Sequence, residues 1–100
     1  MTTLSSLQTS NFQSHQIIRL QHKNTYVYAE VIQVIADRQL CWARPLVLLT
    51  QKSAESGFQA PDTFIDLREG ADLLLPLSWF QAAIDVEVIP ILAQLDIPKP

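Results

Sequence analysis

Thr25-Tyr-Val-Tyr-Ala-Glu-Val-Ile-Gln-Val-Ile35 and Leu40-Cys-Trp-Ala-Arg-Pro-Leu-Val-Leu-Leu-Thr50 are two apolar-rich stretches separated by only four residues. β-Branched and aromatic side chains dominate the first stretch, which is typical of a strand with a buried face. The connection, Ala36-Asp-Arg-Gln39, is polar and has the length found in β-hairpins. We therefore predict one long hairpin over residues 25–50, and this hairpin decides the fold.

The position of the turn sets the pairing of the two arms, and paired side chains share a face of the sheet. One face is apolar, and we predict that it is the core; it carries Val34–Cys41, Ile32–Ala43, Tyr28–Val47 and Tyr26–Leu49. The other face is mixed and suits a surface or an interface; it carries Ile35–Leu40, Gln33–Trp42, Val31–Arg44 and Ala29–Leu46. Pro45 has no N–H for the ladder, so it indicates an edge position or a bulge that would exchange the faces locally.

Shorter elements flank the hairpin. Strands are expected at residues 16–20, 63–67 and 72–75, with a long polar loop over 51–61. Ser78-Trp-Phe-Gln81 fits a capping box, which predicts a helix that continues through Ala83. Beyond it, Val88, Ile91, Leu92 and Leu95 fall at helical spacing, whereas residues 84–88 alternate like a strand. We favour one or two helices broken near Asp85, with a closing strand as the alternative.

The element count sets the fold class. Five short strands and a helical segment in 100 residues predict a mainly β fold, a small SH3-like or OB-like barrel of about five strands with a C-terminal helical segment. Residues 1–14 are rich in Ser, Thr and Gln and are expected to form a flexible N-terminal arm. Residues 15–96 then form the β-barrel domain with its C-terminal helix.

The composition of the chain indicates where in the cell the protein resides and which kinds of site it can hold. Hydrophobic residues make up 48% of the chain and charged residues 17%, so apolar surface is left over for a partner. No apolar stretch approaches the roughly 20 residues of a membrane span, and no signal peptide is recognised. Cys41 is the single cysteine, which excludes an internal disulfide. We expect a cytoplasmic protein without a membrane span.

Charge is divided unevenly along the chain. Residues 1–54 carry five Lys and Arg against two Asp and Glu, whereas residues 55–100 carry two against eight. Halves of opposite sign can attract each other in the folded state or mark two binding faces. A solvated surface with some internal pairing is the simpler interpretation.

Residues with catalytic or metal-binding potential are scattered. His15 and His22 flank the first expected strand without a Cys/His cluster beside them. The carboxylates Asp62, Asp66, Glu69 and Asp72 surround turns. Two glycines in the chain are too few for a phosphate-binding loop. We therefore predict a non-enzyme with no catalytic residue, no metal and no cofactor.

Recognition of another protein is the function that the sequence favours, as an adaptor or assembly factor. Trp and Arg dominate interface energies, so the candidate contacts are Trp42, Arg44, Trp79 and Phe80, with core packing as the alternative for each. The second hypothesis is a barrel that binds RNA or single-stranded DNA through Tyr26, Tyr28 and Trp42 beside Arg19, Lys23 and Arg44. An isoelectric point near 5.1 disfavours it. The third hypothesis is a small-ligand binder or an enzyme, and a homo-oligomer is also compatible with the sequence.

Three segments carry a resemblance to known sequences. Asp66-Leu-Arg-Glu-Gly-Ala-Asp-Leu-Leu-Leu-Pro76, Ile84-Asp-Val-Glu-Val-Ile-Pro-Ile-Leu92 and Cys41-Trp-Ala-Arg-Pro45 resemble a family of small uncharacterised cyanobacterial proteins. The resemblance covers about residues 15–95 and includes no motif of known chemical meaning. It implies a cytoplasmic accessory role, with photosynthesis as one setting, and assigns no functional residue.

Overall fold

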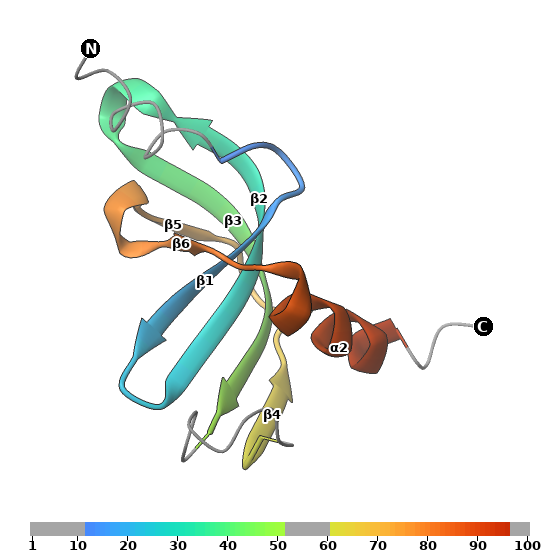
Figure 1. Cartoon of the computed structure of the whole chain (residues 1–100). Coiled ribbons are helices and arrows are strands. Elements are labelled where there is room, and N and C mark those ends of the chain that lie inside the picture. The colour runs from blue at the N-terminus through green and yellow to red at the C-terminus, as the bar shows by residue number, and fades with distance from the viewer. Residues whose placement is uncertain (1–11, 52–60, 97–100) are drawn as a thin grey trace.

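The computed structural model describes residues 12–51 and 61–96, which form one antiparallel sheet and one C-terminal helix (Figure 1). The fold is therefore mainly β, as expected. The sheet has six strands in the order β4-β3-β2-β1-β6, and β5 also pairs with β3. The elements are β1 (Ile17–His22), β2 (Thr25–Ile35), η1 (Ala36–Arg38), β3 (Leu40–Thr50), β4 (Thr63–Asp66), β5 (Leu73–Pro76), η2 (Leu77–Trp79), β6 (Gln81–Ala82) and α2 (Asp85–Asp96).

The long hairpin is confirmed, with both arms at the expected bounds. A 3-10 turn, η1, joins β2 to β3, and Gln39 completes it in the left-handed region at φ 56°. The backbone N–H and the side-chain amide of Gln39 both donate to the carbonyl of Ala36, at 3.1 and 2.7 Å. A contact from outside the hairpin adds to these local bonds, because the backbone N–H of Leu77 donates to the carbonyl of Gln39 at 2.9 Å.

The register of the hairpin differs from the expectation in its middle. Val34–Cys41, Tyr28–Val47 and Tyr26–Leu49 pair as predicted, and so do Ile35–Leu40 and Gln33–Trp42. The predicted pairs Ile32–Ala43, Val31–Arg44 and Ala29–Leu46 are wrong, because the strands pair as Val31–Ala43, Glu30–Arg44 and Ala29–Pro45. Ile32 is an extra residue in β2, and Leu46 is an extra residue in β3. The two bulges cancel, so the ends of the hairpin keep the predicted register.

The bulge beside Pro45 divides the core into two clusters on opposite faces of the sheet. The first core cluster comprises Ile18, Ala29, Val31, Cys41, Ala43, Leu77 and Phe80. The second core cluster comprises Tyr28, Leu46, Val47, Leu49, Ile91 and Leu95. Tyr28 and Ala29 are neighbours in β2, and successive strand residues point to opposite faces. The single apolar core face that the sequence predicted is therefore wrong.

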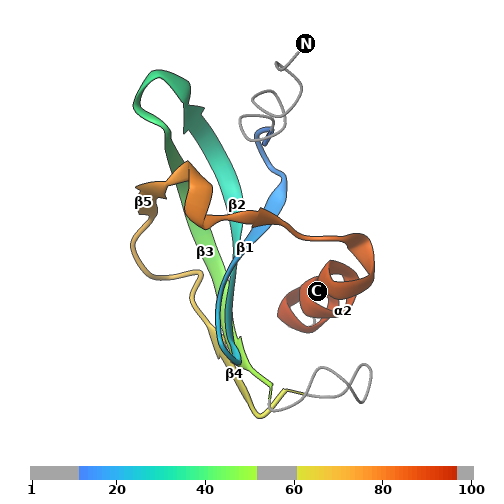
Figure 2. The ribbon, with the colours of Figure 1, turned by 60° about the vertical axis from the view of Figure 1, so that its left-hand side comes forward.

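Each face of the sheet has its own cover. The first core cluster is completed by Leu77 and Phe80, which follow β5. The second is completed by Ile91 and Leu95 of α2. In Figure 2 the sheet is seen nearly edge-on, with α2 to one side of it. The hairpin therefore lies in the middle of the fold, and side chains on both of its faces are buried.

The sheet is open among the described residues. β5 pairs with the first half of β3, through Leu40–Ala43, and β4 pairs with its second half, through Val47–Thr50. At the other end, β6 pairs with β1 only at Ile18 and Arg19. β4 and β6 are the two ends of the strand order and do not pair with each other. The expected closed barrel is therefore not observed.

The predicted helix from Ser78 through Ala83 is wrong. Leu77–Trp79 form a single 3-10 turn, and Phe80 is already extended at φ −98° and ψ 152°. Gln81 and Ala82 then pair with β1 as β6. The extended path lets Leu77 and Phe80, 3% and 5% exposed, both enter the first core cluster. This burial and the backbone pairing outweigh a local capping preference, which is worth about 1 kcal/mol.

The alternative left open for residues 84–95 is decided in favour of a helix, α2, with Pro90 inside it. No helix in the described part of the chain is long and apolar enough to cross a membrane. Most of the predicted arm, residues 1–11, and most of the predicted polar loop, residues 52–60, lie outside the described residues. Phe12, at the end of the predicted arm, packs against the first core cluster.

Candidate functional site

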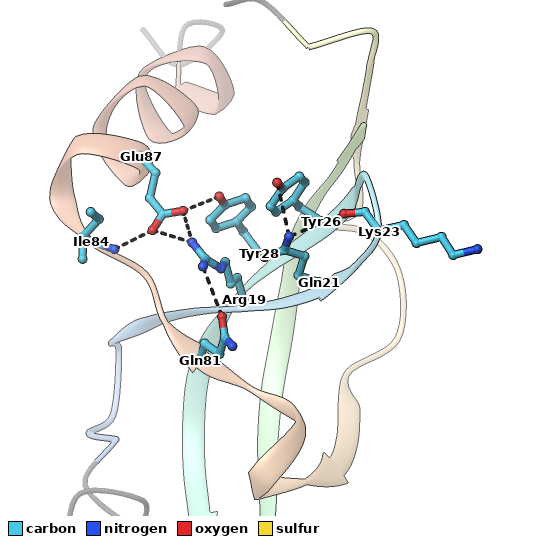
Figure 3. Close-up of polar contacts among 8 residues, drawn as sticks. All are labelled: Arg19, Gln21, Lys23, Tyr26, Tyr28, Gln81, Ile84 and Glu87. Carbon is cyan, nitrogen blue, oxygen red and sulfur yellow. Dashed lines mark hydrogen bonds and ion pairs between the residues drawn. The ribbon is translucent and has the colours of Figure 1, made fainter. Parts of the chain in front are cut away.

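A polar cluster fastens the start of α2 to the sheet (Figure 3). Nη1 of Arg19 donates to both carboxylate oxygens of Glu87, at 2.6 and 2.8 Å. The hydroxyl of Tyr28 donates to Oε1 of Glu87 at 2.6 Å, and the backbone N–H of Ile84 donates to Oε2 at 2.9 Å. The carboxylate of Glu87 therefore accepts hydrogen bonds from two strands and from its own helix.

Local structure explains why these groups meet. Arg19 and Tyr28 are direct partners in the β1–β2 ladder, so their side chains share the face that α2 covers. Glu87 is the third residue of α2 and reaches back to the N–H of Ile84, which precedes the helix. This contact is half of a capping box, and it satisfies an N–H that the helix itself leaves unpaired. The helix therefore begins where it is attached to the sheet.

The cluster shifts the proton affinities of its members. Burial alone would raise the pKa of Glu87, but the hydrogen bonds from Tyr28, Ile84 and Arg19 hold this pKa below its ordinary value. Burial and the nearby Glu87 carboxylate raise the pKa of Tyr28 far above its ordinary value. Glu87 thus stays ionised and Tyr28 stays protonated around neutral pH, which maintains the ion pair with Arg19.

A cavity of about 440 Å³ lies between α2 and the sheet, next to this cluster. Its apolar wall includes Tyr26, Tyr28, Leu49, Phe64, Pro90 and Ile91. The rings of Tyr26 and Tyr28 stack with their centroids 6.5 Å apart and their planes 15° from parallel. The side-chain amide of Gln21 donates to the Tyr26 hydroxyl at 3.4 Å, a long contact (Figure 3). The cavity therefore has an aromatic wall beside a polar one.

Three large apolar residues at the start of α2 are exposed in the described part of the chain. Val86 and Ile89 are 71% and 63% exposed, and Ile84, just before the helix, is 61% exposed. On the inner side, Val88, Ile91 and Leu95 are buried. We define Ile84, Val86 and Ile89 as the outer face of α2.

Two of the predicted contact residues, Trp42 and Arg44, lie together on β3. Nε1 of Trp42 donates to Oδ2 of Asp72 at 3.0 Å, and Nε of Arg44 lies 3.9 Å from Oδ1 of the same carboxylate. Trp42 is 38% exposed and contributes to no core cluster of the described residues. Asp72 therefore joins Trp42 and Arg44 in one polar surface group, which includes no residue of the outer face of α2.

The other two predicted contacts, Trp79 and Phe80, have different surroundings. Trp79 ends the 3-10 turn η2 and is 59% exposed. Phe80 is buried in the first core cluster. The change from 3-10 to extended backbone between these neighbours separates their side chains. The structure therefore brings Trp42 and Arg44 together but joins neither Trp79 nor Phe80 to them.

Sequence reasoning missed both the Arg19–Tyr28–Glu87 cluster and the outer face of α2. Glu87 is 68 residues from Arg19, and no local pattern links them. The opposite charge of the two halves of the chain was the one signal, and this ion pair joins a cation of the first half to an anion of the second. The sequence also contained a signal for the outer face. Val86 and Ile89 are apolar but fall outside the helical stripe of Val88, Ile91 and Leu95.

Other candidate chemistry stays dispersed in the described ranges. His15 pairs with Glu30 at 2.8 Å on the surface, and burial raises the pKa of the Cys41 thiol. Within residues 12–51 and 61–96, no three His, Cys, Asp or Glu side chains gather as a metal site would require. Comparison of the chain with protein-family models, with curated proteins and with solved structures finds no match. The proposals below therefore rest on this chain alone.

Proposed function

We propose that this protein is a non-catalytic protein-interaction module, an adaptor or assembly factor, that docks a partner on the outer face of α2. The observation that carries the proposal is that Ile84, just before α2, and Val86 and Ile89 within it are each more than 60% exposed, while the inner side of the helix is already buried. The three residues lie within six positions of the chain, and grouped exposed apolar residues are typical of interaction sites. Isolated exposed apolar residues would carry no such argument.

Attachment of α2 to the sheet supports the proposal. The Arg19–Glu87 ion pair and the contacts of Ile91 and Leu95 hold the helix on the second core cluster. The outer face is therefore presented by a supported helix, and a partner that binds it need not order a free segment. Trp42, Arg44 and Trp79 remain candidate secondary contacts, whereas the burial of Phe80 favours its alternative role in core packing.

The arrangement of strands supports an SH3-like rather than an OB-like scaffold. β1, β2, β3 and β4 are neighbours in chain order, which is a meander, and β6 returns to β1 after the turn η2. An OB-fold is instead built on a Greek key. The meander with its returning strand leaves one face of the sheet for α2. On the resemblance to small cyanobacterial proteins, we extend the proposal to a cytoplasmic accessory role.

Binding of RNA or single-stranded DNA has weaker support. Arg19 is neutralised by Glu87, and Arg44 lies near Asp72, so two cations of the expected basic groove face carboxylates. Tyr28 is buried, with its hydroxyl bound to Glu87, and cannot act as an open stacking platform.

The test is affinity capture of the tagged protein from native lysate, with and without nuclease. We expect the parent chain to recover a defined protein in near-equal amounts regardless of nuclease. Val86→Ser/Ile89→Ser should lose that protein, while Ile65→Ser/Leu74→Ser, which alters two exposed aliphatic residues of β4 and β5, should retain it. Equal recovery by both double variants would contradict the proposal, and loss on nuclease treatment would favour nucleic acid.

A further inference from the structure

We propose that the cavity between α2 and the sheet is a binding site for an uncharged, flat aromatic small molecule that carries hydrogen-bond acceptors. The site goes beyond the proposed docking function, because it uses the inner side of α2 rather than the outer face. The two proposals can therefore fail independently.

The size and the walls of the cavity suit such a molecule. Its volume of about 440 Å³ lies within the range of roughly 300–1,000 Å³ typical of small-molecule sites. Tyr26 and Phe64 are the partly exposed aromatic side chains of the cavity, and the buried ring of Tyr28 stacks on Tyr26 with the two planes 15° from parallel. Aromatic rings stack on flat π-systems in offset or edge-to-face arrangements. The wall therefore favours a planar ring over an aliphatic chain.

The described lining residues of the cavity offer no unpaired charge to an ionic ligand. Among the described lining residues, Arg19 and Glu87 are the only ones with a charged side chain at neutral pH. They neutralise each other through two hydrogen bonds of 2.6 and 2.8 Å. A ligand with a net charge would leave water for an apolar wall without a counter-ion, which is costly. The ligand that fits is therefore uncharged.

The polar groups at the cavity favour a ligand that accepts hydrogen bonds. The Glu87 carboxylate already accepts four hydrogen bonds from protein groups, so little acceptor capacity is left. In contrast, the side-chain amide of Gln94 lines the cavity and can donate, and that of Gln21 makes only long contacts of 3.4 Å with Lys23 and Tyr26. Carbonyl or ring-nitrogen acceptors on the ligand would complement these donors.

The experiment uses the full chain, labelled with ¹⁵N, and two probes that share one ring system and differ by a carboxylate group. Coumarin is a flat, uncharged ring with a lactone carbonyl, and coumarin-3-carboxylate carries the same ring with a negative charge. We expect coumarin to shift the amide signals of residues around Tyr26, Leu49 and Ile91 in a saturable manner. Coumarin-3-carboxylate should bind at least about tenfold more weakly, because it must leave its hydration shell.

Variants on two walls of the cavity test the assignment. Tyr26→Leu and Phe64→Leu each remove one ring, and either variant that keeps a dispersed amide spectrum should bind coumarin about fivefold to tenfold more weakly. Trp42→Leu removes an exposed ring outside the cavity and should leave coumarin affinity unchanged. Shifts centred on the outer face of α2, no saturable shift at all, equal affinity for the carboxylate, or unchanged affinity in the folded ring variants would each overturn the proposal.

Discussion

Replacement of Glu87 by alanine tests the polar cluster that fastens α2. The variant removes the acceptor of four hydrogen bonds and leaves the Arg19 guanidinium, whose side chain is 24% exposed, without its counter-ion. Breaking a buried ion pair from one side costs about 3–5 kcal/mol. Because both side chains keep some contact with water, we expect the lower end, a loss of about 3 kcal/mol in the free energy of unfolding.

That loss is large for a chain of this size. The total stability of a small domain is about 5–15 kcal/mol. Each 1 kcal/mol shifts the melting temperature of a 60–100-residue domain by about 4–8 °C, so Tm should fall by roughly 12–24 °C. Urea unfolding followed by circular dichroism measures the free energy directly. Hydrogen exchange should also show that the first turn of α2 loses protection before the β2–β3 hairpin does.

Matched variants separate the charge from the hydrogen bonds. Glu87→Gln keeps an acceptor for Tyr28 and Ile84 but loses the charge, so it should cost about 1–2 kcal/mol. Asp66→Ala removes the partner of Arg68 in a surface ion pair and should change the urea midpoint little. A loss below about 1 kcal/mol for Glu87→Ala would refute the reasoning, because a one-sided break of a buried pair should cost more than that.

Three further predictions follow from the same structure. The pKa of Glu87 is depressed in the folded state, so its contribution to stability is present above the ordinary value of 4.5 and is lost as the pH falls through the folded pKa. As the pH is lowered from 6, the free energy of unfolding should therefore fall less steeply in Glu87→Gln than in the parent protein. The same slope in both proteins would contradict this. Val31→Ala should lower the free energy of unfolding by about 2 kcal/mol and Ile32→Ala by clearly less, because the bulge buries Val31 rather than Ile32. A larger loss for Ile32→Ala in urea unfolding would contradict the bulged register. Burial raises the pKa of the Cys41 thiol, so a thiol reagent should label Cys41 only on unfolding, and rapid labelling of the native protein would be inconsistent with this structure.

The elements that the sequence predicts well are those with local signals. β-Branched and aromatic composition with a four-residue polar connection sufficed for both arms of the hairpin. Pro45 also signalled the bulge next to it, because proline cannot donate to the ladder. The second bulge, at Ile32, has no such marker, since isoleucine fits any strand position. It shifted three of the predicted pairs.

Long-range contacts decided what local signals could not. The capping-box pattern at Ser78 did not produce a helix, because Leu77 and Phe80 are buried instead in the first core cluster. Their partners in that cluster come from β1, β2 and β3. The cluster around Glu87 joins residues 59 and 68 positions apart, so its existence depends on the packing of α2 against the sheet. Helical spacing predicted the inner side of α2, but only the fold shows that Val86 and Ile89 have no cover among the described residues.

The most direct test of the central claim is photo-crosslinking from the outer face of α2. The photoreactive residue benzoylphenylalanine would replace Val86 in one variant and Ile65, an exposed aliphatic residue of β4, in a matched control. Illumination in nuclease-treated native lysate should give one defined protein adduct from position 86 and none from position 65. Absence of an adduct at position 86, or the same adduct from both positions, would contradict docking on the outer face of α2.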